Sequence, residues 1–382
     1  MAQDTRFVGL DVHAATIAVA VAEAGTESAR SLGTIPHTPE AVARLMKKLG
    51  PAASLRVCYE AGPCGYGLYW QLTALGVACT VVAPTLIPVR AGDRVKTDRR
   101  DAEKLARCFR QGDLTAVWVP TPATEALRDL VRARVCAKLD QLRARHRLSK
   151  FLLRRGCRPP ADVRAWSTRY LSWVRAQTFP YAAQDVSFRD YLHEVEHVAD
   201  RLVSLEHAID EAITAAEPTQ RAVIAGLQAR RGVSQLTAVT LVAEVGTFGR
   251  FARPKQLMGY AGMVSREASS GPRVRRGAIT KTGNAHVRRV VGEAAWTARY
   301  RPAVSPILKR RQAGLPVEVV AIAWRAQQRL HRRYQRLLGR GKVKQQVVTA
   351  VGRELLGFIW AIAVQVEAQH PAATDRREGV AA

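Results

Sequence analysis

The chain has 382 residues, long enough for two or three domains, and its 47% hydrophobic content excludes a wholly disordered protein. Lysines and arginines number 59 against 32 acidic residues, and the resulting net charge of +27 indicates a polyanionic partner, most commonly nucleic acid. The sequence has no signal-peptide pattern and no stretch of about 18 uninterrupted apolar residues, so we expect a cytoplasmic protein without a membrane partner. The six cysteines form no CxxC pair, which argues against a zinc site.

The N-terminal part alternates apolar runs of strand length with segments of helical spacing. Residues 6–32 contain three such runs, beginning with FVGLDV, and we expect three strands there. The next predicted elements, in chain order, are a helix at 39–50, a strand at 54–62, a helix at 66–76, a strand at 78–84 and a helix at 96–112. This succession is typical of the ribonuclease H-like fold, so we predict an α/β architecture for this part.

The middle of the chain is predicted to be helical. Residues 124–158 carry eleven Lys and Arg against three acidic residues, which fits either a solvated helix face or a helix that faces nucleic acid. Residues 156–185 contain Trp and Pro and are expected to be irregular, with no assignable role. Apolar residues three and four apart from Phe188 to Ile213 predict a coiled-coil or helical-hairpin seam.

Residues 222–300 are expected to form a second compact region. The segment GVSQLTAVTLVAEVG reads as a turn that feeds a helix, as in helix-hairpin-helix modules, although Ser234 stands where such a hairpin usually has its second Gly. A polar loop follows at SREASSGPRVRRGAITKTGNAH. Between Arg299 and Lys344 the chain carries thirteen Lys and Arg against one acid, Glu318. The tail after His370 is expected to be disordered.

Four carboxylates are the first candidates for chemistry. Asp11 ends the first predicted strand and Glu60 ends the strand SLRVCYE, so parallel pairing would place both at one edge of the sheet. Asp98 and Asp101 are three residues apart at the start of a helix and share one face. Clustered carboxylates favour a hard cation such as Mg²⁺ or Mn²⁺, which activates phosphodiesters. The alternative is that they are ordinary strand-end and helix-capping acids.

The serine pair Ser269-Ser270 is the second candidate. Gly271 follows it, and the arginines of the same loop are Arg273, Arg275 and Arg276. A hydroxyl can attack a phosphodiester if the leaving oxygen is stabilised, glycine allows close approach of the backbone, and arginines bind phosphate. On the residues alone, a flexible loop is the more common interpretation of such a segment.

With these residues in view, the chain resembles the DEDD-type insertion-sequence transposases of the one-ten/eleven-eleven group, also called bridge-RNA-guided recombinases. The matching segments cover residues 6–120 and 222–300; they are GLDVH, YEAGPCGYG, KTDRRDAEKLA, GVSQLTAVTLVAEVG, FARPKQLMGYAGMV, SSG and RGAITKTGNAHVRRVVGEAAW.

The resemblance implies a RuvC-like DEDD nuclease domain over residues 1–122, a helical coiled-coil linker over 123–220 and a mainly helical transposase domain over 221–370, ahead of the tail 371–382. It implies that Asp11, Glu60, Asp98 and Asp101 bind Mg²⁺ and that Ser270 becomes covalently joined to DNA. We further predict nucleic-acid contacts for Arg273, Arg275, Arg276 and Lys281.

The partners that the resemblance implies are donor and target DNA, a structured guide RNA, and further copies of the chain, as a homodimer that assembles to a tetramer. Such an enzyme would act at the bacterial nucleoid. Two alternatives stay open at this point. A RuvC-like junction-resolving endonuclease would use the carboxylates without a covalent intermediate. A non-catalytic DNA- or RNA-binding protein would use neither group.

Overall fold

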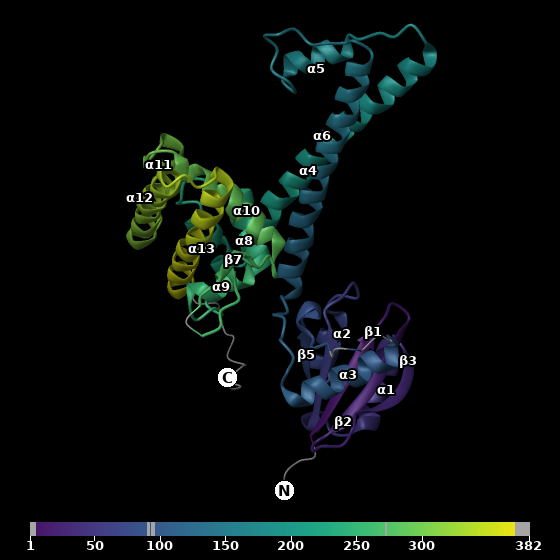
Figure 1. Ribbon diagram of the computed structural model, residues 1–382. Helices are drawn as coiled ribbons and strands as arrows, with labels where there is room; N and C mark the ends of the chain where they lie inside the picture. The colour runs from purple at the N-terminus through teal and green to yellow at the C-terminus, as the bar shows by residue number, and fades with distance from the viewer. Residues whose placement is uncertain (1–4, 90–91, 93–95, 272, 371–382) are drawn as a thin grey trace. The chain divides into compact units, whose positions relative to one another are not determined.

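The computed structural model describes residues 5–89, 92, 96–271 and 273–370, so the tail expected to be disordered lies outside the described residues. The chain divides into two compact units, Met1–Pro120 and Thr121–Ala382 (Figure 1). The first is a mixed α/β unit and the second is largely helical, in agreement with the predicted fold classes. The predicted separation of residues 123–220 from 221–370 stays a prediction.

The N-terminal unit contains one five-stranded sheet in the order β3-β2-β1-β4-β5. Its strands are β1 (Arg6–Val12), β2 (Thr16–Glu23), β3 (Arg30–Pro36), β4 (Leu55–Glu60) and β5 (Ala78–Val82). β1, β2 and β3 form an antiparallel meander, and β4 and β5 extend it in parallel with β1. The strands predicted from the apolar runs are all present.

Helices cover both faces of this sheet. They are α1 (Pro39–Leu49), α2 (Gly67–Ala74) and α3 (Asp98–Gln111), with short 3-10 turns at Ala52–Ser54 and Pro84–Leu86. Because side chains alternate along a strand, Val19 and Val21 of β2 belong to the core shared with α1 and α2. The intervening alanines, such as Ala20, pack with Ala102 and Ala106 of α3. Small residues on this second face let α3 lie close to the sheet.

The second unit begins with a long helical hairpin. α4 (Pro122–Arg154) and α6 (Ala182–Ala215) pack along each other, and α5 (Thr168–Arg175) lies at the far end of the hairpin (Figure 1). The prediction that residues 156–185 are irregular was wrong in part, because α5 begins at an N-cap, Ser167, whose side chain accepts a hydrogen bond from the Tyr170 amide. Aromatic side chains of α4, α5 and α6 form a core there.

The rest of the second unit is a helical core. It contains α7 (Pro218–Leu227), α8 (Gln235–Val245), α9 (Pro254–Tyr260), α10 (Ala285–Ala295), the 3-10 turn Trp296–Arg299, α11 (Pro306–Gln312), α12 (Val317–Gly339) and α13 (Lys344–Gln369). Helix α8 lies at its centre, with every residue from Ala238 to Val245 buried. Ser234 caps α8 by accepting a hydrogen bond from the Thr237 amide, which gives this serine a local role in the turn that feeds the helix.

The polar loop expected after residue 264 contains two short strands, β6 (Ser265–Glu267) and β7 (Arg276–Ile279), paired antiparallel. The expectation of a loop without strands was therefore wrong for these seven residues. In the described part of the chain, α13 is the one helix long and apolar enough to cross a membrane, with a mean hydropathy of 1.7 over its most apolar window. Half of that window is buried, and α13 contributes residues such as Val351, Leu355 and Ile359 to the core of the second unit.

Candidate functional site

Two of the predicted carboxylates end neighbouring strands. β1 and β4 pair in parallel, with Leu10 opposite Tyr59, so Asp11 and Glu60 come next along their strands at the same edge of the sheet. Both line one pocket of about 480 Å³ at that edge. The pairing predicted from the strand ends is therefore present, as a consequence of the parallel register.

The other two carboxylates are carried to this edge by α3. Gly9 makes the approach possible: a β-carbon on this residue would lie 2.4 Å from the carbonyl oxygen of Ala102 and from the amide nitrogen of Ala106. The helix begins at Thr97, whose side chain accepts a hydrogen bond from the Arg100 amide. Asp98 and Asp101 therefore lie in the first turn of α3, near the C-terminal end of β1, where Asp11 lies.

A histidine that the sequence analysis did not single out lies between two of these carboxylates. Ligand atoms of Asp11, His13 and Asp98 all lie within 4.8 Å of one another, an arrangement that could hold a metal ion. His13 Nε2 is 3.4 Å from Asp11 Oδ2 and 3.6 Å from Asp98 Oδ1. The available signal was the position of His13 in GLDVH, two residues after Asp11.

The electrostatics of this cluster favour a cation. Burial raises the pKa of Asp11, and the nearby Asp101 and Asp98 raise it further, while His13 lowers it. The pKa of Glu60 is also raised, chiefly by burial and then by Asp11. Lys96 Nζ lies 3.9 Å from Asp101 Oδ2 and compensates only part of the negative charge. Oxygen donors in a crowded anionic cluster fit a hard divalent ion of the Mg²⁺ or Mn²⁺ type.

The serine pair lies at the turn of the β6–β7 hairpin. Ser270 and Arg273 exchange backbone hydrogen bonds of 3.2 Å in both directions, which closes the turn. Gly271 has a φ of 55°, in the left-handed region where a side chain would be strained. The hairpin therefore gives the serines fixed and different positions.

The two serine hydroxyls differ in their hydrogen bonds. Ser269 Oγ donates to Glu267 Oε1 at 2.9 Å and accepts from the amide of Arg275 at 3.3 Å. Ser270 is exposed, and its hydroxyl has no hydrogen bond to any residue that the structure describes. Glu267 also accepts from Nε of Arg276 at 3.2 Å, and these two contacts, Ser269 first, lower its pKa. The Ser269 hydroxyl thus stabilises the turn, whereas the Ser270 hydroxyl makes no hydrogen bond with the described residues.

Three of the predicted nucleic-acid residues lie at or next to this turn, and the fourth, Lys281, lies at the base of the hairpin. Arg275 and Arg276 line a pocket of about 680 Å³ together with Arg266. Arg273 is exposed at the turn itself. Lys281 has a φ of 57°, and its amide donates to the Gly262 carbonyl at 3.0 Å. The pocket brings Arg275 and Arg276 together, and the contacts of all four residues with nucleic acid stay predictions.

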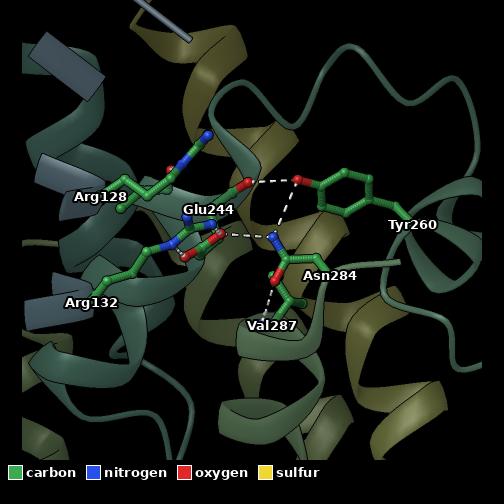
Figure 2. A network of polar contacts seen from close by, with 7 residues as sticks. Arg128, Arg132, Glu244, Tyr260, Asn284 and Val287 are labelled. Carbon is green, nitrogen blue, oxygen red and sulfur yellow. Dashed lines mark hydrogen bonds and ion pairs between the residues drawn. The ribbon is translucent and has the colours of Figure 1, made fainter. Parts of the chain in front are cut away.

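A buried polar network supports the base of the hairpin (Figure 2). Glu244 of α8, with a side chain 1% exposed, accepts hydrogen bonds from Arg132 Nε at 2.8 Å and from Asn284 Nδ2 at 2.7 Å. The Tyr260 hydroxyl donates to the Glu244 carbonyl at 2.8 Å, and Asn284 caps α10 by accepting from the Val287 amide. The network joins α4, α8, α9 and α10, and sequence reasoning missed it.

An acidic cluster at a sheet edge and a basic hairpin that carries an exposed serine are compatible with a class of enzyme that acts on nucleic-acid phosphodiesters. Profiles of known families agree with this class. The family described as "Transposase", of the DEDD type, matches residues 8–155, and the "Transposase IS116/IS110/IS902 family" matches residues 225–309.

Curated relatives lead to the same family. The chain is 44% identical to the "Putative transposase y4qE" of Sinorhizobium fredii over 360 residues, covering 94% of this chain and 88% of the relative. It is 33% identical to the "Transposase for insertion sequence element IS1533" of Leptospira borgpetersenii, covering 87% and 96%. The chain therefore belongs to the IS116/IS110/IS902 family of insertion-sequence transposases, which are DNA transposases and recombinases.

Proposed function

We propose that the N-terminal unit is a ribonuclease H-like, RuvC-like nuclease domain whose Asp11, Glu60, Asp98 and Asp101 bind Mg²⁺, with Mn²⁺ as an alternative. The observation that supports this proposal most directly is that carboxylate oxygens of Asp11 and Asp98 lie within 4.8 Å of each other, together with the raised pKa of Asp11. When bound, the ion supplies charge stabilisation to the phosphodiester that reacts. The carboxylates hold it, and His13 orients Asp11 and Asp98.

Ser270 is the proposed nucleophile. Its Oγ forms an ester with the phosphorus of a DNA phosphodiester, one P–O bond of the DNA breaks, and the departing DNA oxygen takes up a proton. The free hydroxyl of Ser270 supports this assignment over Ser269, whose hydroxyl is hydrogen-bonded within the hairpin. Because a phosphate ester is conserved, attack by a DNA hydroxyl on the phosphoserine rejoins the DNA and restores Ser270. Arginines of the hairpin hold the phosphate.

The test is a denaturing gel of labelled DNA that carries the ends of the insertion element, incubated with protein, Mg²⁺ and RNA transcribed from the DNA beside the gene. A covalent complex migrates as a slow band that protease removes. We expect the band with the wild-type protein and with Ser269→Ala, and its loss with Ser270→Ala and with Asp11→Ala. If Ser269→Ala alone loses the band, Ser269 is the nucleophile. If the double serine variant still forms it, the serine mechanism is wrong; if DNA is cut without any band, a junction-resolving endonuclease is the better description.

The same proposal includes a guide RNA and an assembly of copies. A structured RNA encoded beside the gene would pair with donor and target DNA, the α4–α6 region would serve as a coiled-coil linker, and a homodimer would assemble to a tetramer at the nucleoid. The support is the family membership and the excess of basic residues. Sequencing the RNA that copurifies with the protein tests the guide, which fails if no RNA from the flanking DNA is enriched. Sedimentation with DNA tests the assembly, which fails if the protein stays monomeric.

A further inference from the structure

Helix α12 carries four arginines on one face. Arg329 lies three and four residues before Arg332 and Arg333, and these lie four and three residues before Arg336, which brings all four toward one side of the helix. They line a pocket of about 430 Å³ together with Glu354 of α13. The opposite side of α12, with residues such as Leu330, is buried in the core of the second unit. The arginines are thus presented from a fixed helix.

Glu354 organises two of the four guanidinium groups. It pairs with Nε of Arg329, and its Oε2 lies 3.0 Å from Nε of Arg333. The Glu354 side chain is 17% exposed, so the pair with Arg333 lies at the floor of the pocket. The hydrogen-bonded pair with Glu354 restrains the Arg329 side chain before any ligand arrives, which lowers the entropy cost of binding, and Arg333 lies beside the same carboxylate without a hydrogen bond to it. One carboxylate against four guanidiniums leaves the pocket strongly positive.

The other two guanidinium groups remain free to bind. Arg332 makes one long contact, from Nε to the carbonyl of Gln328 at 3.4 Å, and Arg336 has no hydrogen bond or ion pair with the residues described. Both side chains are exposed. Like charges at these spacings repel and destabilise a helix, and an anion between them removes that cost. A merely solvated helix face would not need the carboxylate of a second helix beneath it.

We propose that this arginine pocket binds backbone phosphates of duplex DNA. Arginine forks match phosphate oxygens, and the four positions span about 10 Å of the helix, enough for more than one phosphate. The residues that line the pocket include no aromatic side chain on which an unpaired base could stack, which favours a duplex backbone over a single strand. The proposal rests on DNA as the substrate of the family and is independent of the serine chemistry.

The experiment measures binding of the full-length protein to a fluorescent duplex of random sequence, by anisotropy over a range of salt and without Mg²⁺. The pocket variant is Arg332→Gln with Arg336→Gln. The matched control is Arg325→Gln with Arg340→Gln, which removes the same charge from an exposed position within α12 and from its exposed C-cap, both outside the pocket. We expect the pocket variant to bind roughly tenfold more weakly or worse, with a salt slope reduced by about two, and the control to change affinity by less than about threefold.

Two further experiments separate the effect of charge from that of the guanidinium group, and binding of DNA from binding of RNA. Arg332→Lys with Arg336→Lys keeps the charge without the guanidinium fork and should fall between wild type and the glutamine variant. A hairpin RNA of the same length replaces the duplex in the second arm. Equal losses in the pocket and control variants overturn the proposal, because general charge would explain them. A loss for RNA alone also overturns it. Equal melting temperatures of the variants exclude unfolding, and because no strand is cut here, failure of the serine mechanism leaves this result unaffected.

Discussion

Gly9 of β1 lies so close to Ala102 of α3 that an added β-carbon would sit 2.4 Å from the Ala102 carbonyl oxygen. The separation sets how near the first turn of α3, with its two carboxylates, lies to Asp11. A methyl group at position 9 would therefore push α3 away from the sheet, and the carboxylates in the first turn of α3 would move away from Asp11.

We expect Gly9→Ala to shift α3 away from the sheet and to lower the free energy of unfolding by about 1–3 kcal/mol, the usual cost of overpacking. DNA strand exchange should be lost as well, because Asp98 and Asp101 move with the helix. Thermal melting and a recombination assay measure the two effects. Gly67→Ala is the control, since a β-carbon there meets nothing within 4 Å. An active Gly9→Ala protein would contradict the proposed role of this contact.

Replacing any of the four carboxylates should remove activity without destabilising the protein, unlike the replacement of a core residue. We expect Asp11→Ala, Glu60→Ala, Asp98→Ala and Asp101→Ala each to abolish strand exchange without lowering the melting temperature in the absence of metal. Burial and mutual repulsion raise the pKa values of Asp11 and Glu60, so removing one charge relieves the others. Melting with and without Mg²⁺ should show metal stabilisation only in the wild type. Full activity of any two variants would disprove the assignment.

Much of the N-terminal site follows from the sequence because it depends on strand ends. The apolar runs place Asp11 and Glu60 at the ends of strands, and the order of elements makes those strands parallel neighbours. His13 could not be placed in this way. Its contacts depend on where the chain turns after β1 and on how closely α3 lies to Gly9, and neither follows from hydrophobic periodicity.

The C-terminal site is less predictable from the sequence. Ser269 and Ser270 are chemically identical neighbours, and only the register of the hairpin determines that Ser269 is the one that hydrogen-bonds to Glu267. Glu244 had a weak signal, as a lone acid in the apolar run VTLVAEV, but its partners Arg132 and Asn284 are remote in sequence. Such pairings are set by tertiary packing, which no local pattern encodes.

Glu244 should make the stability of the second unit dependent on pH. Burial raises its pKa, but hydrogen bonds from Arg132 and Asn284 outweigh burial and hold the pKa below its ordinary value of 4.5. A carboxyl group whose pKa is lowered by folding stabilises the folded state at any pH above its ordinary pKa. This stabilisation is lost as the pH falls through the lower pKa of the folded state. Glu244→Gln should therefore cost about 1–3 kcal/mol at neutral pH, and the difference from wild type should shrink in acid.

Urea unfolding of the wild type and of Glu244→Gln across that acidic range measures the effect. Glu211→Gln is the control, since Glu211 is 69% exposed and pairs with His207 of the same helix. Parallel pH profiles of wild type and Glu244→Gln would show that the network does not depend on the charge of Glu244.

The basic residues should not contribute equally to nucleic-acid binding. On α4, Arg134 and Arg147 are paired with Glu206 and Glu194 of α6, so part of the charge on that helix is already neutralised. Lys309 and Arg310 of α11 are exposed and have no ion pair with the described residues. Affinity for DNA should fall steeply with salt, and Lys309→Gln with Arg310→Gln should reduce the slope by about two.

Arg134→Gln with Arg147→Gln should leave the salt slope within about half a unit of the wild type. Anisotropy titrations at several salt concentrations give both slopes. A nearly flat salt dependence of the wild type would mean that these charges contact no phosphate, and equal slopes for the two double variants would mean that the ion pairs of α4 open on binding.

Arg275 and Arg276 line the same pocket beside the serine turn, yet they should differ in their effect on the reaction. Arg276 donates from Nε to Glu267, whereas the side chain of Arg275 makes no hydrogen bond with the described residues. A free guanidinium can follow the phosphate as charge builds on its oxygens.

Arg275→Gln should therefore slow formation of the covalent complex by about 10-fold to 100-fold, and Arg276→Gln by less than about tenfold, with smaller changes in DNA affinity for both. Rates come from a time course of the protease-sensitive band, and affinities from anisotropy without Mg²⁺.

Adding Glu267→Gln to Arg275→Gln provides the sharper test. The amide oxygen of glutamine can still accept the Ser269 hydroxyl, while Arg276 loses its charged partner and becomes free to bind the phosphate. The double variant should react faster than Arg275→Gln alone. If it reacts more slowly, Glu267 holds the turn through its charge; if Arg276→Gln proves the more harmful single change, the paired arginine is the one that contacts the phosphate.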